Sequence, residues 1–292
     1  MTKFLIIVDL HGNKPKIYTK DFDAIIAPGD FCSDNLRKYM FKALKITLDT
    51  NEEVWWYDIM SKSKAKKEII KSLKDGRKIL EFLNSFNKPV FVLPGNWDWT
   101  GNEDWDYLDK NYWRSYLIKG LKNIRNTHKN IFKFKDLTIL GHGITSGPEY
   151  PVKERSKNMS KSEIKKEKNN YKKQYFSPMN KLFVKAKKHK QPIIFLTHNV
   201  PYNTKLDKIL DKRSPRVGQH FGSYLARQLI EKHKPLASIG GHMHEHFGKD
   251  KIKGTTIINA GFGSYVNTIL EIKEGKIKNL KFIQKGKVIQ KF

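Results

Sequence analysis

The sequence predicts an α/β (α+β) fold in which two mixed β-sheets pack together and helices cover their outer faces. Short apolar, β-branched runs, which predict buried strands, alternate with helical patterns in the first part of the chain. In the last part, strand patterns follow one another, and this succession favours two packed sheets with helices outside. The length of 292 residues suits one large domain, so residues 1–292 are expected to form a single domain.

The N-terminal elements follow from the spacing of apolar residues. Residues 3–8 and 23–27 are short apolar runs that predict buried strands. Residues 36–86 repeat apolar side chains at near helical spacing, and a break near residues 49–52 divides them into two or more helices. Strands are then expected at residues 90–93, 131–134, 137–140, 192–196 and 236–239, and helices at residues 103–117 and 221–233.

The C-terminal tail has a different pattern. Residues 255–289 alternate between apolar and polar side chains, which suggests three antiparallel strands. Gly263, Glu274 with Gly275, and Lys285 with Gly286 would supply the turns. The tail is therefore expected to add a meander to the strands that precede it.

The composition limits the class of protein. No run approaches the ~18 apolar residues of a membrane span, and the opening apolar run is too short for a signal sequence, so a cytoplasmic protein is expected. Cys32 is the single cysteine, which excludes an intrachain disulfide. The net charge of +28 fits a nucleic acid, an anionic surface or an acidic substrate. Lysines spread over a solvated surface would explain the charge equally well.

One stretch is unusually basic. Residues 151–190 contain 14 Lys or Arg and 3 Glu, a net charge of +11. This composition predicts a partly helical insertion within the domain. It would either hold a polyanion, so that nucleic acid is a possible partner, or form a solvated helix without a partner.

Five short motifs offer oxygen or imidazole ligands, and most of them follow a predicted strand. They are Asp9-Leu10-His11, Gly29-Asp30, Gly95-Asn96-Trp97-Asp98, Thr197-His198-Asn199 and Gly241-His242-Met243-His244. Open sheets gather their sites where strands end in loops. If these five ends converge on one edge of the sheets, they would form a pocket for two metal ions.

The residue types suit a pair of metal ions. Two cations ~3.5–4 Å apart repel each other, and a carboxylate such as Asp30 can bridge them. The Asp-x-His and His-x-His pairs would each turn two side chains to one face of an extended strand. Asn96 adds an oxygen without charge, and His198 completes the second set. Mn²⁺ is the expected ion, with Fe, Zn²⁺, Ni²⁺ and Co²⁺ as alternatives. Such ions activate water for in-line attack on a phosphate ester.

In the order of these motifs, the chain resembles the calcineurin-like metallophosphoesterases. The resemblance covers residues 3 to about 265. It implies a four-layer αββα sandwich with the metal site at the edge of the sheets. It also implies one metal held by Asp9, His11, Asp30 and His244, and a second held by Asp30, Asn96, His198 and His242.

The third motif departs from the commonest family pattern. Many members carry a histidine where this chain has Trp97, and that histidine is thought to stabilise the transition state or protonate the leaving oxygen. The retained Asp98 could orient a neighbouring group, which makes Asp30, Asn96 and Asp98 the candidate catalytic residues. His142, His220 and His246 are possible substitutes for the missing histidine, although a structural role or simple exposure is the favoured interpretation of each. Substrates with good leaving groups would suffer least from its loss.

A cluster of tryptophans follows the same motif. Trp97, Trp99 and Trp105 could form a wall on which a nucleobase stacks. Alternatively, they form a hydrophobic lid, since aromatic side chains are usually buried. Trp97, His142 and His220 are therefore the candidate substrate-binding residues.

These observations predict a metal-dependent hydrolase of phosphate esters. A phosphodiesterase acting on a nucleotide or nucleic acid is favoured, because the guanidinium and histidine groups typical of some monoesterases are not evident. A phosphomonoesterase, a nuclease that uses the basic insertion, and a non-catalytic scaffold are the alternatives. The protein phosphatases of this superfamily carry Gly-Asp-x-x-Asp-Arg-Gly in the second motif. In this chain Asp34 falls one position later than the second aspartate of that pattern and the arginine is missing, so a protein phosphatase is disfavoured. The sequence leaves the oligomeric state open.

Overall fold

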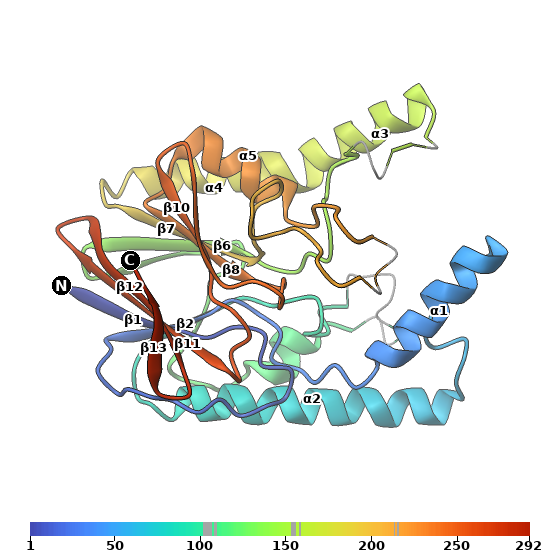
Figure 1. Cartoon of the computed structure of the whole chain (residues 1–292), viewed down its shortest axis with the longest axis horizontal. Coiled ribbons are helices and arrows are strands. Elements are labelled where there is room, and N and C mark those ends of the chain that lie inside the picture. Colours follow the sequence, from blue (N-terminus) through green and yellow to red (C-terminus); the bar gives the residue numbers. More distant parts are fainter. Residues whose placement is uncertain (102–106, 108–109, 153–155, 158, 213, 215) are drawn as a thin grey trace.

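The computed structural model describes residues 1–101, 107, 110–152, 156–157, 159–212, 214 and 216–292. Two mixed β-sheets face each other, and helices cover the outer face of each sheet (Figure 1). The predicted four-layer αββα arrangement is confirmed. Trp105 and the expected start of a helix at Glu103 lie outside the described residues.

The first sheet has seven strands. Their bounds are β1 (Thr2–Ile6), β2 (Ala24–Ala27), β3 (Val90–Val92), β4 (Ile124–Asn126), β11 (Val266–Lys273), β12 (Lys276–Gln284) and β13 (Lys287–Lys291). The spatial order is β13-β12-β11-β1-β2-β3-β4. Strands β1 to β4 pair in parallel, whereas β11 pairs antiparallel with both β1 and β12. The parallel half therefore directs the ends of β1, β2 and β3 to one edge.

The second sheet has six strands. Their bounds are β5 (Ile131–Phe134), β6 (Leu137–His142), β7 (Ile193–Asn199), β8 (Ala237–Gly241), β9 (Gly248–Ile252) and β10 (Thr255–Asn259). The spatial order is β5-β6-β7-β8-β10-β9, and the four inner strands pair in parallel. The ends of β7 and β8, which precede the fourth and fifth motifs, therefore lie at a common edge.

The helices cover both outer faces. They are α1 (Arg37–Thr50), α2 (Lys62–Asn84), α3 (Lys161–Tyr171), α4 (Ser177–Lys187) and α5 (Tyr224–His233), with the π-helices η1 (Trp113–Leu117) and η2 (Lys172–Phe176). In Figure 1, α2 lies under the first sheet, and α4 and α5 lie over the second. Helices α1 and α3 project at the end of the molecule opposite the two termini.

Strand β1 shows why the sandwich forms. Phe4 and Ile6 point into the core between the two sheets. Leu5, and Ile7 directly after the strand, point into the core between the first sheet and α2. All four side chains are fully buried. A strand covered on both faces reads as a continuous apolar run rather than an alternating one.

The C-terminal tail differs from its prediction. Residues 266–291 do form three antiparallel strands, with turns at Glu274–Gly275 and Lys285–Gly286. Residues 255–259, however, belong to β10, which pairs with β8 and β9 in the second sheet. The segment around Gly263 therefore crosses between sheets and is not a hairpin turn. Strands β4 and β9 were not expected, because their residues are polar or only half-buried at most positions.

The described residues of the basic stretch are largely helical. Its helices α3, η2 and α4 follow one another, and Ser160 with Glu163 forms a capping box at the start of α3. That this stretch is an insertion within a single domain stays a prediction. Among the described helices, none combines the length and the apolar composition that a membrane span requires.

One buried carboxylate holds the edge of the first sheet together. Oδ1 of Asp98 accepts the backbone N–H groups of Phe31 and Cys32, and Oδ2 accepts those of Asp30 and Gly95, at 2.9–3.0 Å. The side chain is fully buried. Asp98 thus connects the loop after β2 to the loop after β3, and it leaves none of those four donors unpaired.

Helix α2 supports the same loop from below. Ser72 donates a hydrogen bond to the carbonyl of Ser33 at 2.8 Å and accepts one from the indole of Trp99 at 3.2 Å. Gly76 lies against Cys32, so closely that an added Cβ would stand 2.5 Å from the Cys32 sulfur and 3.0 Å from its backbone nitrogen. A glycine is therefore required where the helix passes the loop.

We expect Gly76→Ala to lower the free energy of unfolding by about 1–3 kcal/mol, because the new methyl group overpacks the contact with Cys32. Alanine has the higher helix propensity, so the opposite sign would be expected from propensity alone. Urea denaturation measures the change. Lys74→Ala, on the exposed face of the same helix, is the control and should be neutral or stabilising. Equal behaviour of the two variants would contradict the packing argument.

We expect Asp98→Asn to lower the free energy of unfolding by about 1.5–3 kcal/mol, because the amide NH₂ would face backbone N–H donors that a carboxylate oxygen now accepts. Hydrogen exchange should show faster exchange at Asp30, Phe31 and Cys32. Asp34→Asn, which changes a half-exposed carboxylate in the same loop, is the matched control. Unchanged exchange in Asp98→Asn would show that the loop is held by other contacts.

Candidate metal centre

Most candidate ligands lie in loops just beyond the strands, whereas His198 lies within β7. Asp9, His11, Asp30 and His242 all have left-handed backbone conformations, with φ between 45° and 70°. The expectation that Asp9 and His11 share one face of an extended strand is therefore wrong, since β1 ends at Ile6. Left-handed conformations are uncommon for residues other than glycine, and they concentrate at functional sites. Here they turn the side chains toward one another.

Hydrogen bonds between loops fix these turns. The N–H groups of Asp9 and His11 donate to the carbonyls of Gly29 and Asp30, at 3.2 and 2.9 Å. From the second sheet, the N–H of His242 donates to Oδ2 of Asp9 at 2.7 Å. The edges of the two sheets are thus joined at the candidate site.

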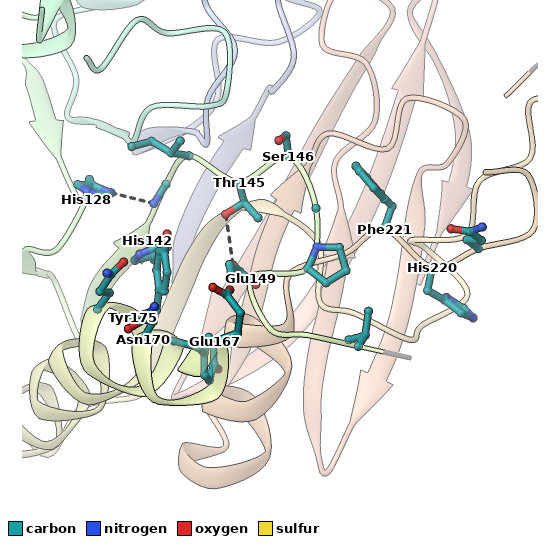
Figure 2. A pocket seen from close by; sticks show the side chains of 18 of the residues that line it. His128, His142, Thr145, Ser146, Glu149, Glu167, Asn170, Tyr175, His220 and Phe221 are labelled. Atoms are coloured by element: carbon teal, nitrogen blue, oxygen red, sulfur yellow. Dashed lines mark hydrogen bonds between the residues drawn. The ribbon is translucent and has the colours of Figure 1, made fainter. Parts of the chain in front are cut away.

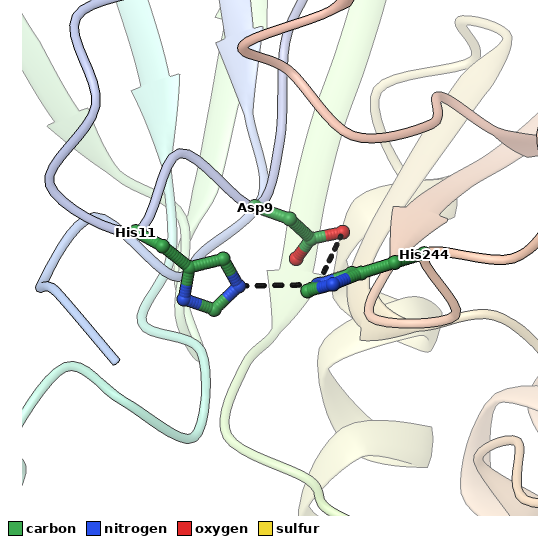
Figure 3. A group of neighbouring side chains, drawn as sticks. All are labelled: Asp9, His11 and His244. Carbon is green, nitrogen blue, oxygen red and sulfur yellow. Dashed lines mark hydrogen bonds and ion pairs between the residues drawn. The ribbon is translucent and has the colours of Figure 1, made fainter. Parts of the chain in front are cut away.

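Asp9, His11 and His244 form the first group that could hold a metal ion. Figure 3 shows the two imidazoles facing each other beside the carboxylate. The two Nε2 atoms are 3.1 Å apart, and Nε2 of His244 lies 3.8 Å from Oδ2 of Asp9. Three ligand atoms from loops far apart in sequence therefore lie within 4.8 Å of one another.

Asp30, His198 and His242 form the second group. Nε2 of His198 lies 3.3 Å from Oδ2 of Asp30 and 3.3 Å from Nδ1 of His242. Asn96 joins them, with its Oδ1 3.0 Å from the same His198 nitrogen. Oxygen and nitrogen lone pairs thus converge on one point.

A single oxygen of Asp30 stands between the two groups. Its Oδ2 lies 3.3 Å from Nε2 of His198 and 3.6 Å from Nε2 of His11. Its Oδ1 accepts the backbone N–H of Trp97 at 2.9 Å, which orients the carboxylate. One carboxylate oxygen is therefore placed to serve both groups.

The tautomer of His198 is set by the backbone. Its Nδ1 lies 2.9 Å from the carbonyl of Pro28, which can only accept a hydrogen bond. Nδ1 therefore carries the proton, and Nε2 is left to present a lone pair to the second group. Gly29 makes this approach possible, because an added Cβ would stand 2.6 Å from the same imidazole. A backbone carbonyl behind a histidine is typical of metal ligands.

Burial and neighbouring charges shift the pKa values of the candidate ligands. Burial, assisted by the Asp30 carboxylate, raises the pKa of Asp9 to about 8. Burial also lowers the pKa of His242 to about 3, so this imidazole is neutral. For His198 burial acts in the same direction, but the Asp30 and Asp9 carboxylates outweigh it and raise the pKa to about 9. Without a metal ion, Asp9 and His198 therefore hold protons near neutral pH, and a divalent ion would have to displace them, since metal ligands are deprotonated.

A buried oxygen atom without a hydrogen-bond partner also indicates a cation site. Oδ1 of Asp9 is buried and has no hydrogen-bond partner among the described residues. A buried carboxylate oxygen without a partner costs free energy, which a bound cation would recover. The residues present therefore fit a pair of divalent metal ions.

The other predicted residues lie around this centre. Trp97 and Trp99 are buried in the core under the first sheet, and the ring of Trp97 stands edge-on to His11 at 6.3 Å between centroids. His142 and His220 line a cavity beside the centre. Asp98 contacts the loop of Asp30 through backbone N–H groups, so its observed contacts are positional.

The cavity itself was not anticipated. It measures about 970 Å³, and loop residues 143–149 form much of its wall (Figure 2). Asp207 was also missed, a fully buried carboxylate that accepts from Nδ1 of His220 at 2.8 Å. No local motif surrounds Asp207, and no spacing in the sequence could have indicated the cavity.

Comparison with proteins of known structure shows the same fold. One crystal structure is 14% identical, with a TM-score of 0.59, and the match covers 97% of this chain and 98% of that one. The protein TT1561 of Thermus thermophilus is 15% identical, with a TM-score of 0.52 and the same coverage. At this identity the likeness concerns the fold alone. No curated protein sequence matches the chain.

A family model provides the assignment. The model of the calcineurin-like phosphoesterases matches residues 2–246, which include all five motifs. This family comprises metal-dependent hydrolases of phosphate esters, in agreement with the two groups of candidate ligands. The chain therefore belongs to the calcineurin-like phosphoesterase family.

Proposed function

We propose that this enzyme is a phosphodiesterase with two divalent metal ions, acting on a nucleotide or a nucleic-acid-like substrate. The observation that carries the proposal is the position of Asp30 Oδ2 between the two histidine groups. Two cations that lie ~3.5–4 Å apart need a shared anionic ligand. The family and the donor set together support hydrolysis at a phosphorus centre.

Each ion has its own ligands in this proposal. Asp9, His11 and His244 hold the first ion, Asn96, His198 and His242 hold the second, and Asp30 serves both. Mixed oxygen and nitrogen ligands without a thiolate favour Mn²⁺ over softer ions, with Fe, Zn²⁺, Ni²⁺ and Co²⁺ as further candidates. When bound, such ions lower the pKa of water and offset charge on the phosphoryl oxygens.

The preference for diesters rests on the sequence, in which the guanidinium and histidine groups typical of some monoesterases are not evident, and position 97 adds a constraint on the leaving group. The side chain of Trp97 is buried and offers no proton that could be transferred to a leaving oxygen. Substrates with good leaving groups tolerate this loss best. The backbone N–H of Trp97 has a different role, since it donates a hydrogen bond to Oδ1 of Asp30 and holds that carboxylate in position.

The high positive charge supports a nucleotide or nucleic acid over a neutral ester. In the basic stretch, Lys165, Lys166, Lys172 and Lys173 are exposed on α3 and η2. A nuclease that uses these helices is the second candidate, and it would bind single-stranded DNA with a steep dependence on salt. The cytoplasmic location is part of the same proposal.

We expect the metal-stripped protein to be inactive and to regain hydrolysis of bis(4-nitrophenyl) phosphate when Mn²⁺ is added. The matched monoester, 4-nitrophenyl phosphate, should turn over more slowly. Release of nitrophenolate measures both reactions. Preference for the monoester would contradict the diester assignment. Inactivity toward both substrates, with two ions bound per chain, would favour the scaffold alternative.

We expect Asp30→Asn to reduce diester hydrolysis by more than about 100-fold, since even groups outside the ligand shell change metal affinity or activity by about 10–100-fold. The bound metal per chain should also fall, which elemental analysis measures. Asp136→Asn, in the turn between β5 and β6, is the control. Full activity of Asp30→Asn would overturn the shared-ligand proposal.

A further inference from the structure

The cavity beside the metal centre has no assigned role. Its volume of about 970 Å³ is at the upper end of the range of small-molecule sites. In Figure 2, His128, His142, Asn170 and Tyr175 gather on one side of it, and Phe221 lies on the other. The walls come from the loop after β6, from α3 and η2, and from the segment before α5.

Two walls of the cavity touch the metal centre. The ring of Phe221 stacks on His242, with centroids 6.3 Å apart and an interplanar angle of 18°. On the other side, the N–H of Ile144 donates to the carbonyl of Pro94 at 2.6 Å, two residues before Asn96. A substrate with its phosphate at the metal centre can therefore extend an organic group into the cavity.

His142 is a polar side chain of this wall. Only 5% of it is exposed, and no hydrogen bond pairs either ring nitrogen with another described residue. Its ring neighbours are His128 at 5.4 Å and Tyr175 at 6.1 Å between centroids. The side chain lines the cavity and its ring nitrogens keep some accessible surface there, so a ligand in the cavity can form hydrogen bonds with them.

His128 defines a second polar position. Its Nδ1 accepts the N–H of Gly143 at 2.9 Å, so Nε2 carries the proton. Burial, with the charges of Lys129 and Arg114, lowers the pKa of His128 to about 3, and burial lowers the pKa of His142 as well. The cavity thus presents two neutral imidazoles, which together offer N–H donors and a nitrogen acceptor.

The remaining lining is polar and nearly balanced in charge. Lys129 and Arg216 are its basic side chains, and Glu149 and Glu167 are its acidic ones. Glu149 is occupied, because it accepts from Oγ of Ser223 and from the N–H of Leu225. This balance disfavours a second phosphate group and favours an uncharged group.

The side-chain amides and aromatic rings of the lining further indicate which uncharged group the cavity would bind. The side chains of Asn170, Gln174 and Gln219 each offer both a donor and an acceptor, and Tyr175 adds an aromatic surface. Paired donors and acceptors next to aromatic rings are how proteins recognise the edges and faces of unstacked bases.

We propose that this cavity is the specificity pocket of the enzyme and binds the nucleoside of a phosphodiester, with His142 hydrogen-bonded to the base. The inference rests on the proposed function, since the phosphate would occupy the metal centre. It adds that the group recognised is an uncharged nucleoside and not a second phosphate or a simple alkyl group.

The test compares two diesters that share a leaving group. Thymidine 5′-(4-nitrophenyl) phosphate and methyl 4-nitrophenyl phosphate both release nitrophenolate, and they differ only in the group that the cavity would receive. With the Mn²⁺-loaded protein, we expect kcat/KM to be at least about tenfold higher for the thymidine ester, the effect of one or two hydrogen bonds. Equal values for the two esters would overturn the proposal.

Variants assign the preference to the cavity. His142→Leu should lose most of the preference, because KM should rise more for the thymidine ester than for the methyl ester. Asn170→Ala, at a half-exposed position of α3, is the second variant should His142→Leu fold poorly. His189→Ala changes a histidine near the opposite end of β6, where it contacts Thr138, and is the control. A preference that survives both cavity variants would contradict the assignment.

A binding measurement separates this proposal from the proposed function. Isothermal titration of thymidine into the metal-free protein should show binding that is weakened in His142→Leu, whether or not any ester is hydrolysed. Hydrolysis of both esters without thymidine binding would leave the phosphodiesterase in place and remove the nucleoside pocket. Thymidine binding without hydrolysis of either ester would overturn the proposed phosphodiesterase function. If 2-deoxyribose bound as tightly as thymidine, recognition of the base would be excluded.

Discussion

The Asp98 carboxylate is the constraint on which the metal centre depends. Four backbone N–H groups from two loops converge on it inside the protein, where no water can replace it. These bonds hold Asp30 in a left-handed conformation, which a residue other than glycine rarely adopts. The same loop rests on α2 through Ser72 and the contact of Gly76 with Cys32. The position of the shared carboxylate of Asp30 is thus set by the core of the first sheet.

The second sheet reaches the site through hydrogen bonds across the sandwich. The N–H of His242 donates to Asp9, and Nδ1 of His198 donates to Pro28. The first bond joins the loop after β8 to the loop after β1, and the second joins the end of β7 to the loop after β2. The apolar core between the sheets therefore aligns the two edges, and the polar contacts at the rim complete the alignment. Neither sheet alone could assemble either group of candidate ligands.

The cavity and the metal centre divide the chemistry between them. In the proposed function, the five motifs supply the carboxylate and imidazole ligands of the metal ions. Loop 143–149, α3, η2 and the segment before α5 supply a neutral polar pocket, and these segments lie outside the five motifs. Phe221 stacks on His242, so one wall of the pocket adjoins the candidate metal centre. Such an arrangement lets one catalytic scaffold serve different substrates by changing loops.

The sequence by itself determined the sandwich and the identity of the candidate ligands. Continuous apolar runs such as residues 4–8 predict strands covered on both faces, and the five motifs follow strand ends in a recognisable order. The tertiary structure decided the rest, because these features depend on contacts between residues far apart in the chain. The left-handed turns at Asp9 and His11 require bonds to the next loop, and β10 joins the second sheet only because β8 and β9 flank it. The position of His142 in the cavity likewise depends on residues of α3 and η2 that line the same cavity, which no local pattern encodes.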